Sequence, residues 1–398
     1  MMAWFFWISG SLLALIWSVG ILQLALHFSE IADLTRPEWD PPRDATLPPL
    51  TVIVPARNEE AEIEPALRSL LQLDYPQYEV IAVDDRSTDQ TGAIMDALTA
   101  EPAAQGKLRV LHIKELPQGW LGKLHAMWVG SLRNAALKNA GQGSSEWLLF
   151  TDADCVFHPA TLRRALHYAI KNRVDHLVLF PTGHMKTLGE RMLISFPQVM
   201  SSFAMRPWKI RDPRARDHIG VGAFNLVRRS AYEAIGTYEN LRLEVVDDIK
   251  FGESIKKAGL RQDVVYGPGL VSLRWGKGAA GIIANLEKNM FAFLKYRLSL
   301  VLAVCALVCF MCILPFVALA IAPGWSRAAF AVAVAMIALG YAFAARVSSG
   351  SLWLFLTCPF SAILFIVAVL RSTITTLRDG AVTWRGTKYS LEELKKRS

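Results

Sequence analysis

The chain has 398 residues, of which 53% are hydrophobic and only 20% are charged, with a formal net charge of +8. This composition excludes a disordered chain, and the uneven placement of the apolar residues excludes a single soluble globule. A modest positive balance in an apolar chain favours cytoplasmic loops and anionic lipid head groups as partners. Nucleic acid is not an expected partner, because no basic run in the polar region is interleaved with aromatic residues.

The cysteines indicate neither a zinc site nor a disulfide framework. Cys305, Cys309, Cys312 and Cys358 lie in strongly apolar runs, and Cys155 follows an acidic cluster. No CxxC pair has the polar flanks and histidine partners that a zinc site needs. The absence of a disulfide framework fits a catalytic region in the reducing cytosol.

Four apolar segments are predicted to cross a membrane. Residues 3–26 carry no charge and exceed the ~20 residues that a spanning helix needs. A cleaved signal peptide is the alternative, but no Lys or Arg precedes the run and it is longer than the apolar core of such a signal. The further candidates are 298–321, 328–345 and 351–370, of which 328–345 is short and rich in alanine. The predicted organisation is a transmembrane helix at 1–27, a Pro-rich linker at 28–49, one domain at 50–297, about three transmembrane helices at 298–370 and a basic tail at 371–398.

The expected location is a bacterial-type inner membrane, with several crossings and the central domain facing the cytoplasm. Three spans after that domain would leave the tail outside, although its Lys and Arg residues favour the cytoplasmic side. Either one C-terminal segment is re-entrant or the charge rule is overridden. The sequence leaves both alternatives open.

The central region alternates predicted strands with predicted helices. This order predicts an α/β domain with a mostly parallel sheet, in which ligands bind at the carboxyl ends of the strands. The predicted strands are 50–55, 78–83, 108–113, 147–151 and about 176–180, and the predicted helices are 59–72, 89–98, 121–137 and about 160–171.

Polar clusters follow three of the predicted strands, at residues 55–60, 84–89 and 152–154. Each has a structural alternative as a helix cap or a solvated turn. Asp152 and Asp154 could instead hold one Mg²⁺ or Mn²⁺ ion, which prefers oxygen ligands and shares them with phosphates. Such an ion would suit a diphosphate leaving group. P-loop and dinucleotide-binding motifs are missing from the sequence.

The segments LTVIVPARNEE, VIAVDDRSTDQT and LLFTDADC resemble the nucleotide-sugar half of a family 2 glycosyltransferase with the GT-A fold. The resemblance covers about residues 50–275 and implies an inverting transfer from a nucleotide diphosphate sugar, for which we expect a UDP-sugar. A solvated lysine at a helix start is the alternative for Lys123. The residues implied are Pro55, Ala56, Asn58 and Glu59 in the nucleotide pocket, Asp85 at the base, Lys123 near the phosphates, and Asp152 and Asp154 at the metal.

A second acidic pair opens a predicted helix within residues 244–259. The family has Glu-Asp here with Asp as the base, so Asp248 matches the general base and Asp247 replaces the glutamate. A plain helix cap is the alternative, and we expect the helix dipole to lower the pKa of Asp248. An inverting displacement needs a carboxylate that takes the proton of the acceptor hydroxyl. The resemblance also implies an acceptor-side loop at Gly220, Gly222, Ala223 and Phe224, and catalytic roles for Arg274 and Trp275.

The membrane arrangement most resembles the hopanoid-associated members of this family, which lie near ceramide glucosyltransferases. The implied acceptor is a membrane lipid that is hopanoid-related or ceramide-like. A processive polysaccharide synthase and a non-catalytic nucleotide-sugar-binding scaffold are the competing interpretations. Residues 188–210 are predicted to form an interfacial helix with basic residues at lipid phosphates, or alternatively a core helix with a solvated basic end.

Overall fold

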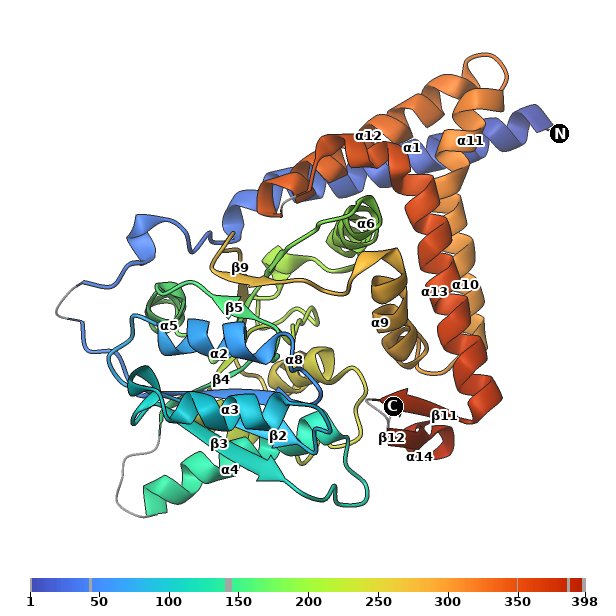
Figure 1. Ribbon diagram of the computed structural model, residues 1–398. Coiled ribbons are helices and arrows are strands. Elements are labelled where there is room, and N and C mark those ends of the chain that lie inside the picture. The colour runs from blue at the N-terminus through green and yellow to red at the C-terminus, as the bar shows by residue number, and fades with distance from the viewer. Residues whose placement is uncertain (1, 43–44, 140–144, 349, 385–386, 396–398) are drawn as a thin grey trace. The chain divides into compact units, whose positions relative to one another are not determined.

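A computed structural model describes the chain apart from residues 1, 43–44, 140–144, 349, 385–386 and 396–398. Its residues form two compact units, each assembled from separate stretches of the sequence (Figure 1). We call residues 31–182 and 207–273 the sheet unit. Residues 1–30, 183–206 and 274–398 form the helical unit.

The sheet unit is built on seven strands in the order β3-β2-β1-β4-β8-β6-β9. β1 is parallel to β2 and β4, and β2 is parallel to β3, so the carboxyl ends of these four strands meet at one edge. β8 is antiparallel to β4 and β6, and β6 is parallel to β9. The predicted α/β fold with a mostly parallel sheet is therefore confirmed. The strands of this sheet are β1 (Leu50–Ala56), β2 (Tyr78–Asp85), β3 (Leu108–Ile113), β4 (Trp147–Phe150), β6 (His176–Leu179), β8 (Asn225–Arg228) and β9 (Gln262–Val265). A second sheet has three short strands in the order β5-β10-β7, namely β5 (Val156–Phe157), β10 (Val271–Leu273) and β7 (Thr182–Gly183).

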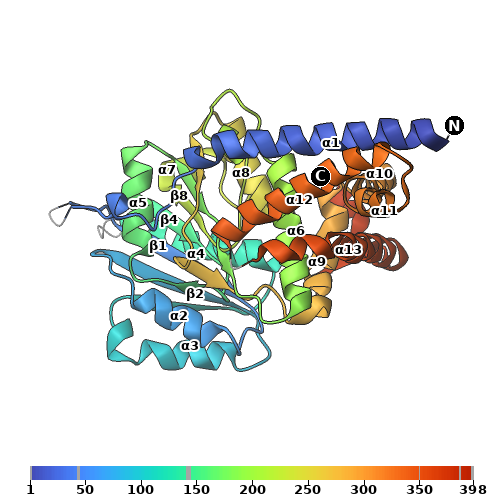
Figure 2. The same ribbon diagram turned by 90° about the horizontal axis from the view of Figure 1, so that it is seen from above.

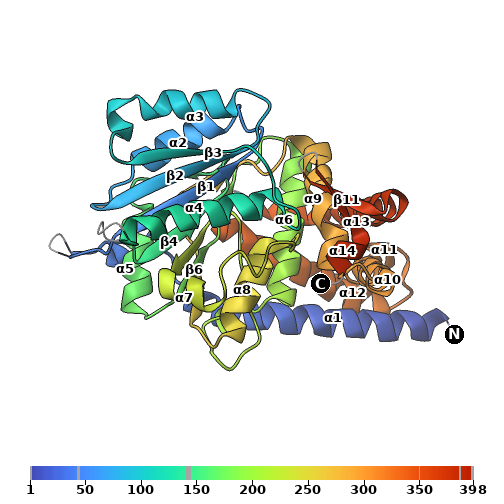
Figure 3. The same ribbon diagram turned by 90° about the horizontal axis from the view of Figure 1, so that it is seen from below.

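Helices cover both faces of this sheet, with α2 and α3 on one side and α4 on the other (Figures 2 and 3). The alternation of side chains along β2 explains this layering. Val80 and Ala82 belong to the main core cluster, whereas Ile81 and Val83 pack with Ala126 of α4. The helices are α2 (Ile63–Leu71), α3 (Thr91–Thr99), α4 (Gly122–Asn139), α5 (Thr161–Lys171), α7 (Arg229–Ala234) and α8 (Asp247–Lys257), with 3-10 turns at Pro37–Trp39, Pro102–Ala104 and Pro207–Lys209.

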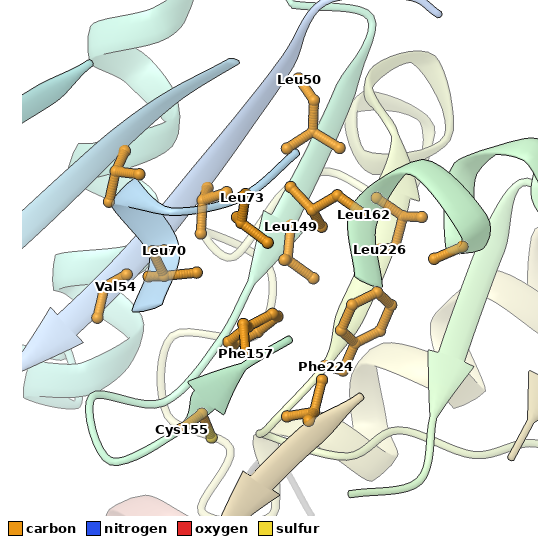
Figure 4. Close-up of a cluster of buried hydrophobic side chains, with 14 of the residues drawn as sticks. Leu50, Val54, Leu70, Leu73, Leu149, Cys155, Phe157, Leu162, Phe224 and Leu226 are labelled. Carbon is orange, nitrogen blue, oxygen red and sulfur yellow. The ribbon is translucent and has the colours of Figure 1, made fainter. Parts of the chain in front are cut away.

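The main core cluster lies between the sheet and helices α2 and α5. Leu149 of β4 and Leu226 of β8 face it from neighbouring strands, and Leu70 of α2 and Leu162 of α5 complete it (Figure 4). These side chains are all at most 1% exposed. The strands that end at the acidic edge are therefore anchored over their length by packed apolar side chains.

The segment before β1 is more than a linker. Leu34 and Leu47 are buried in the main core cluster, and Asp40 binds Arg164 of α5 through both carboxylate oxygens, at 2.9 and 2.7 Å. Tyr266 N–H donates to the carbonyl of Ala32 at 2.9 Å. Residues 31–40 thus pack onto the sheet unit.

The helical unit contains the four long apolar helices that the sequence predicts, each long and apolar enough to cross a membrane: 3–30, 298–321, 326–346 and 352–379. A five-residue π-helical turn, Cys309–Ile313, interrupts the second, and the indole N–H of Trp17 donates to the carbonyl of Met311 there at 3.1 Å. The helices are α1 (Met2–His27), α6 (Leu188–Ala204), α9 (Gly278–Phe293), α10 (Leu298–Val308), α11 (Leu314–Ile321), α12 (Ser326–Val347) and α13 (Cys358–Asp379), with 3-10 turns at Phe28–Glu30 and Leu352–Thr357 (η6).

Two predicted segments differ from the observed ones. The predicted interfacial helix at 188–210 ends at Ala204, before Arg206 and Pro207, since proline disfavours a helical residue in front of it. The predicted basic tail is largely folded, because α13 extends to Asp379 and a hairpin of β11 (Ala381–Trp384) and β12 (Thr387–Ser390) follows, with α14 (Leu391–Lys395) after it. Basic residues 385, 396 and 397 lie outside the described residues.

Candidate active site

Acidic side chains gather where β4 ends and where α8 begins. Lys123, in the first turn of α4, joins the two places: its Nζ lies 2.8 Å from Asp152 Oδ1 and 3.5 Å from Asp247 Oδ2. Its side chain is only 13% exposed. The alternative of a solvated lysine at a helix start is therefore wrong, and Lys123 belongs to the acidic site.

Gly222 lies between Asp152 and Asp248. Its N–H donates to Asp248 Oδ2 at 3.2 Å, and its carbonyl accepts from Asp152 N–H at 3.1 Å. A Cβ on Gly222 would lie 2.4 Å from Asp152 Oδ2, and one on Gly220 would lie 1.8 Å from the carbonyl oxygen of Asp248. Both glycines are thus needed for the chain to approach the acids this closely.

Ala223 and Phe224, the other two predicted acceptor-side residues, belong to the core. They are 4% and 0% exposed, and Phe224 packs beside Phe157 with 6.2 Å between ring centroids. The Ala223 carbonyl accepts from Thr151 Oγ1 at 2.8 Å. These contacts hold the loop that contains Gly220 and Gly222 against the end of β4.

The acidic site contains more negative charge than the protein neutralises. Burial, with the charge of Asp152 next, raises the pKa of Asp154 to about 7. Burial, with the charge of Asp247 next, raises the pKa of Asp248 to about 7. The expectation that the helix dipole would lower the pKa of Asp248 is therefore wrong, because desolvation and the neighbouring carboxylate outweigh it.

The carboxylates of Asp152 and Asp154 suit a divalent cation that takes its other ligands from a substrate. Asp152 and Asp154 offer carboxylate oxygens, and a cation beside Asp154 would offset the repulsion from Asp152 and Glu59 that contributes to its raised pKa. Within the described residues, no group of three or more His, Cys, Asp or Glu side chains is arranged to hold a metal. Further ligands would have to come from phosphate oxygens or water, as is usual for Mg²⁺.

The predicted nucleotide loop after β1 is tied to the loop after β2. Asn58 N–H donates to Ser87 Oγ at 3.1 Å, and Asn58 Oδ1 accepts from Thr88 N–H at 2.8 Å. Glu59 N–H donates to Thr91 Oγ1 at 2.8 Å. These bonds explain why α2 begins at Ile63 and not at residue 59 as predicted. Pro55 and Ala56 are the last two residues of β1, and both are buried.

Asp85, the predicted base contact, ends β2 and is 2% exposed. Its carboxylate binds the guanidinium of the next residue, with Arg86 Nε 2.8 Å from Oδ1 and Nη2 3.1 Å from Oδ2. The sequence analysis assigns no role to Arg86, which lies in the polar cluster at residues 84–89. Its φ of +57° cannot be seen in the sequence.

Arg274 and Trp275, the other predicted catalytic residues, lie in the helical unit. Arg274 Nη2 lies 2.7 Å from Glu190 Oε1, and the Glu190 side chain is fully buried. Glu190 also accepts from Gly278 N–H and Lys186 N–H, each at 2.7 Å. Trp275 packs against an apolar cluster of α6, α9 and α13. The structure thus does not group these two residues with Asp248 in one unit.

Glu190 was missed by sequence reasoning, although a local signal was present. Thr187 and Glu190 have the spacing of a capping box, and Thr187 Oγ1 accepts from Glu190 N–H at 3.3 Å. The box predicts the start of α6. That the same carboxylate also binds Arg274, 84 residues away, required the fold.

The sequence and the fold are similar to those of known glycosyltransferases. The sequence model of glycosyl transferase family 2 matches residues 51–236. The chain is similar to 4,4'-diaponeurosporenoate glycosyltransferase of Staphylococcus aureus (strain MRSA252), with 23% identity over 352 residues that cover 86% of this chain and 89% of that protein. Its fold is similar to that of a mannosyltransferase from Pyrobaculum calidifontis, solved in complex with GDP-Man and Mn²⁺, with 20% identity, a TM-score of 0.50 and coverage of 93% of this chain and 99% of the other. The match to glycosyl transferase family 2 thus covers residues 51–236 of the 398, and the seven-stranded sheet has the GT-A fold.

Proposed function

We propose that the protein transfers a sugar, with inversion, from a nucleotide diphosphate sugar to the hydroxyl of a membrane lipid. The observation that carries this proposal is the buried acidic site, in which Asp152 after β4 and Asp247 at the start of α8 share Lys123. Donor-side and acceptor-side acids are thus adjacent, as a direct displacement requires.

Asp248 is the proposed general base. It lies at the start of α8, and its Oδ2 accepts from Gly222 N–H at 3.2 Å, which orients the carboxylate. Asp247 would support it, because its charge disfavours loss of the proton that Asp248 accepts. Removal of the base should cost roughly 10²–10⁴-fold in rate.

Asp152 and Asp154 are the proposed ligands of a Mg²⁺ or Mn²⁺ ion. When bound, such an ion would neutralise charge on the diphosphate as the sugar leaves. Lys123 would hold Asp152 in position from the other side. The proposed donor is a UDP-sugar, although the mannosyltransferase of similar fold was solved with GDP-Man.

The proposed acceptor is an apolar lipid, hopanoid-related or ceramide-like. Four apolar helices suggest membrane association, and the relative from Staphylococcus aureus is named for 4,4'-diaponeurosporenoate, a carotenoid acid. A carboxylate acceptor is already ionised at neutral pH and needs no base, whereas a hydroxyl does. The buried acids Asp247 and Asp248 therefore favour a neutral hydroxyl over an anionic carboxylate in this chain.

The direct experiment supplies purified full-length protein, Mn²⁺ and a labelled UDP-sugar or GDP-Man with extracted membrane lipids, and identifies the product by mass spectrometry. A lipid that gains one sugar supports the proposal. A long glycan on the lipid would instead indicate a processive synthase, and no product with any donor would indicate a scaffold. Calorimetric titration with UDP and GDP tests the donor, since equal or stronger GDP binding contradicts a UDP-sugar.

Contacts within the helical unit support a topology in which the C-terminal hairpin lies on the side of the membrane where α1 ends. α1 and α12 run parallel, because Gly10 lies against Phe330, and Phe28 lies 5.5 Å from Phe343 between ring centroids. α11 and α12 are joined by a short turn at 322–325. The chain would thus cross inward on α1, outward on α10–α11 and inward on α12.

The segment after α12 supports a re-entrant turn and not a further crossing. Cys358, at the start of α13, lies beside Cys312, near the middle of the second apolar helix, and beside Tyr341 of α12. Near the other end of α13, Ser372 Oγ accepts from Phe291 N–H of α9 at 3.0 Å, and α9 leads directly into α10. Residues 350–357 would therefore return into the membrane before α13 leaves it on the cytoplasmic side.

This topology resolves the conflict with the charge rule, since Arg371 and Arg378 then lie on the cytoplasmic side. Reporter fusions in a bacterial host test it. Green fluorescent protein fused after residue 398 should fluoresce and alkaline phosphatase there should be inactive, with the opposite pattern for insertions at Gly324. An active phosphatase after residue 398 would contradict the re-entrant turn.

A further inference from the structure

His112, near the end of the outer strand β3, lies between two carboxylates of neighbouring elements. Its Nδ1 is 2.9 Å from Asp84 Oδ2 on β2, and its Nε2 is 3.0 Å from Asp96 Oδ1 on α3. Asp84 is buried, whereas Asp96 is exposed. Gly92, in the first turn of α3, closes over the contact, because an added Cβ would lie 2.9 Å from Asp84 Oδ2. The three side chains thus form one bridge from β2 through β3 to α3.

The geometry of this bridge requires a charged imidazole ring. An ionised carboxylate offers only acceptor oxygens, and a neutral imidazole has one N–H group and one acceptor nitrogen. A neutral His112 could therefore make one of the two contacts, and its bare nitrogen would face a carboxylate oxygen at the other. The hydrogen bond to Asp84, and then that to Asp96, raise the pKa of His112 above its ordinary value of 6.5.

Two carboxylates set the charge of His112. Asp84 acts on the ring from β2 and Asp96 acts on it from α3. Residues that are paired directly across β2 and β3, such as Asp84 and His112, share one face of the sheet. Alternation along the strands places the other charged residues of β2 and β3 on the opposite face, which α4 covers: Glu79, Asp85 and Arg109.

Asp84 connects this bridge to the loops that follow β1 and β2. Its Oδ1 accepts from Ser87 N–H at 3.1 Å, and Ser87 Oγ accepts from Asn58 N–H at 3.1 Å. Between these contacts, Arg86 and Asn58 have φ values of +57° and +54°. Residues other than glycine rarely adopt such values unless the surrounding structure enforces them. The two loops therefore depend on Asp84 for their conformation, and Asp84 depends on His112 for its orientation.

We propose that His112 is a positioning residue for donor binding, which in its charged form holds Asp84 and, through it, the loops after β1 and β2. This inference rests on the proposed nucleotide-sugar donor, because these loops contain the predicted nucleotide contacts Asn58 and Asp85. Loss of one proton from the ring removes one of its two contacts and loosens the loops. The contribution of His112 to donor affinity is therefore complete below its pKa and declines as the pH rises through it.

Calorimetric titration of the full-length protein in detergent with Mn²⁺ tests the inference, using UDP, or GDP if it binds more tightly, from about pH 6 to about pH 9. His112→Phe keeps a flat ring without N–H groups. Because this variant leaves Asp154 and Asp248 unchanged, the ratio of wild-type to variant affinity isolates His112. The ratio should be about tenfold at the low end of the range and below about threefold at the high end. A ratio that does not vary with pH would overturn the inference.

His167→Phe on α5 is the matched control. Burial, followed by the charge of Lys171, lowers the pKa of His167, so no carboxylate bridge is lost in this variant. The ratio of wild-type to variant affinity should stay near unity across the range.

Asp96→Asn separates positioning from a general loss of structure. Its amide can donate to the bare nitrogen of a neutral ring, and its oxygen can accept from a charged one. The affinity of this variant relative to wild type should be near unity at the low end and rise to about threefold at the high end. A relative affinity that is the same at both ends would contradict the role of the charged ring.

Hydrogen exchange distinguishes failure of this inference from failure of the proposed function, because it needs no nucleotide. At the low end of the range, the amides of Ser87 and Thr88 should exchange about tenfold faster in His112→Phe than in wild type. Wild type that binds no nucleotide overturns the proposed donor and with it the donor role of His112. Normal nucleotide binding with unchanged exchange in His112→Phe overturns the inference alone. Thermal melting of each variant confirms that it is folded before binding is compared.

Discussion

Two buried groups of charged side chains in this protein differ in how completely their charges are satisfied. In the helical unit, Glu190 binds Arg274 and two backbone N–H groups, and these contacts, Arg274 first, lower its pKa to about 2. In the sheet unit, burial raises the pKa values of Asp154 and Asp248 to about 7. One carboxylate is stabilised in its ionised form, while the others are destabilised in theirs.

The contrast indicates which group is structural and which is functional. A paired and hydrogen-bonded buried carboxylate holds segments together, and breaking it costs stability. A crowded set of acids that share one lysine weakens the fold, and such sites persist where a ligand or a reaction uses the charge. Removal of an acid from the acidic site should therefore lower turnover without lowering stability, and removal of Glu190 should lower stability without lowering turnover.

The largest effect is expected for Asp154→Asn. Loss of the carboxylate proposed to bind the metal should reduce transfer roughly 10³-fold, while removal of a repelled charge should raise thermal stability. Because the pKa is raised from 3.8 to about 7, the ionised carboxylate weakens the fold increasingly between these pH values and fully above the higher one. Melting curves in chelator at several pH values measure this. Asp74→Asn, at an exposed surface pair, should change neither property, and full activity of Asp154→Asn would remove Asp154 from the metal site.

Lys123→Met should have an intermediate effect on turnover. Asp152 and Asp247 would lose the cation that lies 2.8 and 3.5 Å from them, so we expect a stability loss of about 3 kcal/mol and transfer reduced about tenfold to a hundredfold. Lys250→Met is the control, because the Lys250–Glu253 pair on α8 is more exposed and should contribute less than about 1 kcal/mol. Unchanged melting and turnover in Lys123→Met would show that the lysine does not hold the acids together.

The smallest effect on turnover is expected for Glu190→Gln. The variant should lose about 2 kcal/mol of stability, while transfer per folded molecule stays near that of wild type. Because the pKa is lowered to about 2, this contribution is present above the unfolded value of about 4.3 and disappears as the pH falls toward 2. If turnover instead falls a hundredfold while stability is unchanged, Arg274 has the catalytic role that the family resemblance implies.

Much of the fold could be predicted from the sequence because its signals are local. The run Leu50–Ala56 and the run Trp147–Phe150 are apolar and short, and both form buried strands. The four apolar helices follow from length and composition alone. β8 was not predicted, because a four-residue strand that runs antiparallel inside the sheet has no distinctive pattern.

The site was predicted in part, and the limit was electrostatic. Asp152, Asp247 and Lys123 could each be selected from motifs, and the fold brings them together. The pKa of Asp248 was expected to be low from its place at a helix start, which is a local argument. Its burial and its neighbour Asp247 reverse that direction, and burial depends on the packing of distant segments.

Asp248 is proposed as the base for a hydroxyl acceptor. A comparison of the transfer rates of Asp248→Asn and Asp247→Asn tests this role most directly. Both variants would be measured with the same donor and lipid under single-turnover conditions, with nucleotide affinity and melting temperature as controls. We predict at least a roughly hundredfold loss of transfer for Asp248→Asn and a milder loss for Asp247→Asn, with nucleotide binding unchanged. Wild-type turnover of Asp248→Asn together with a dead Asp247→Asn would contradict the assignment and give the role to Asp247, and full turnover of both would contradict a hydroxyl acceptor.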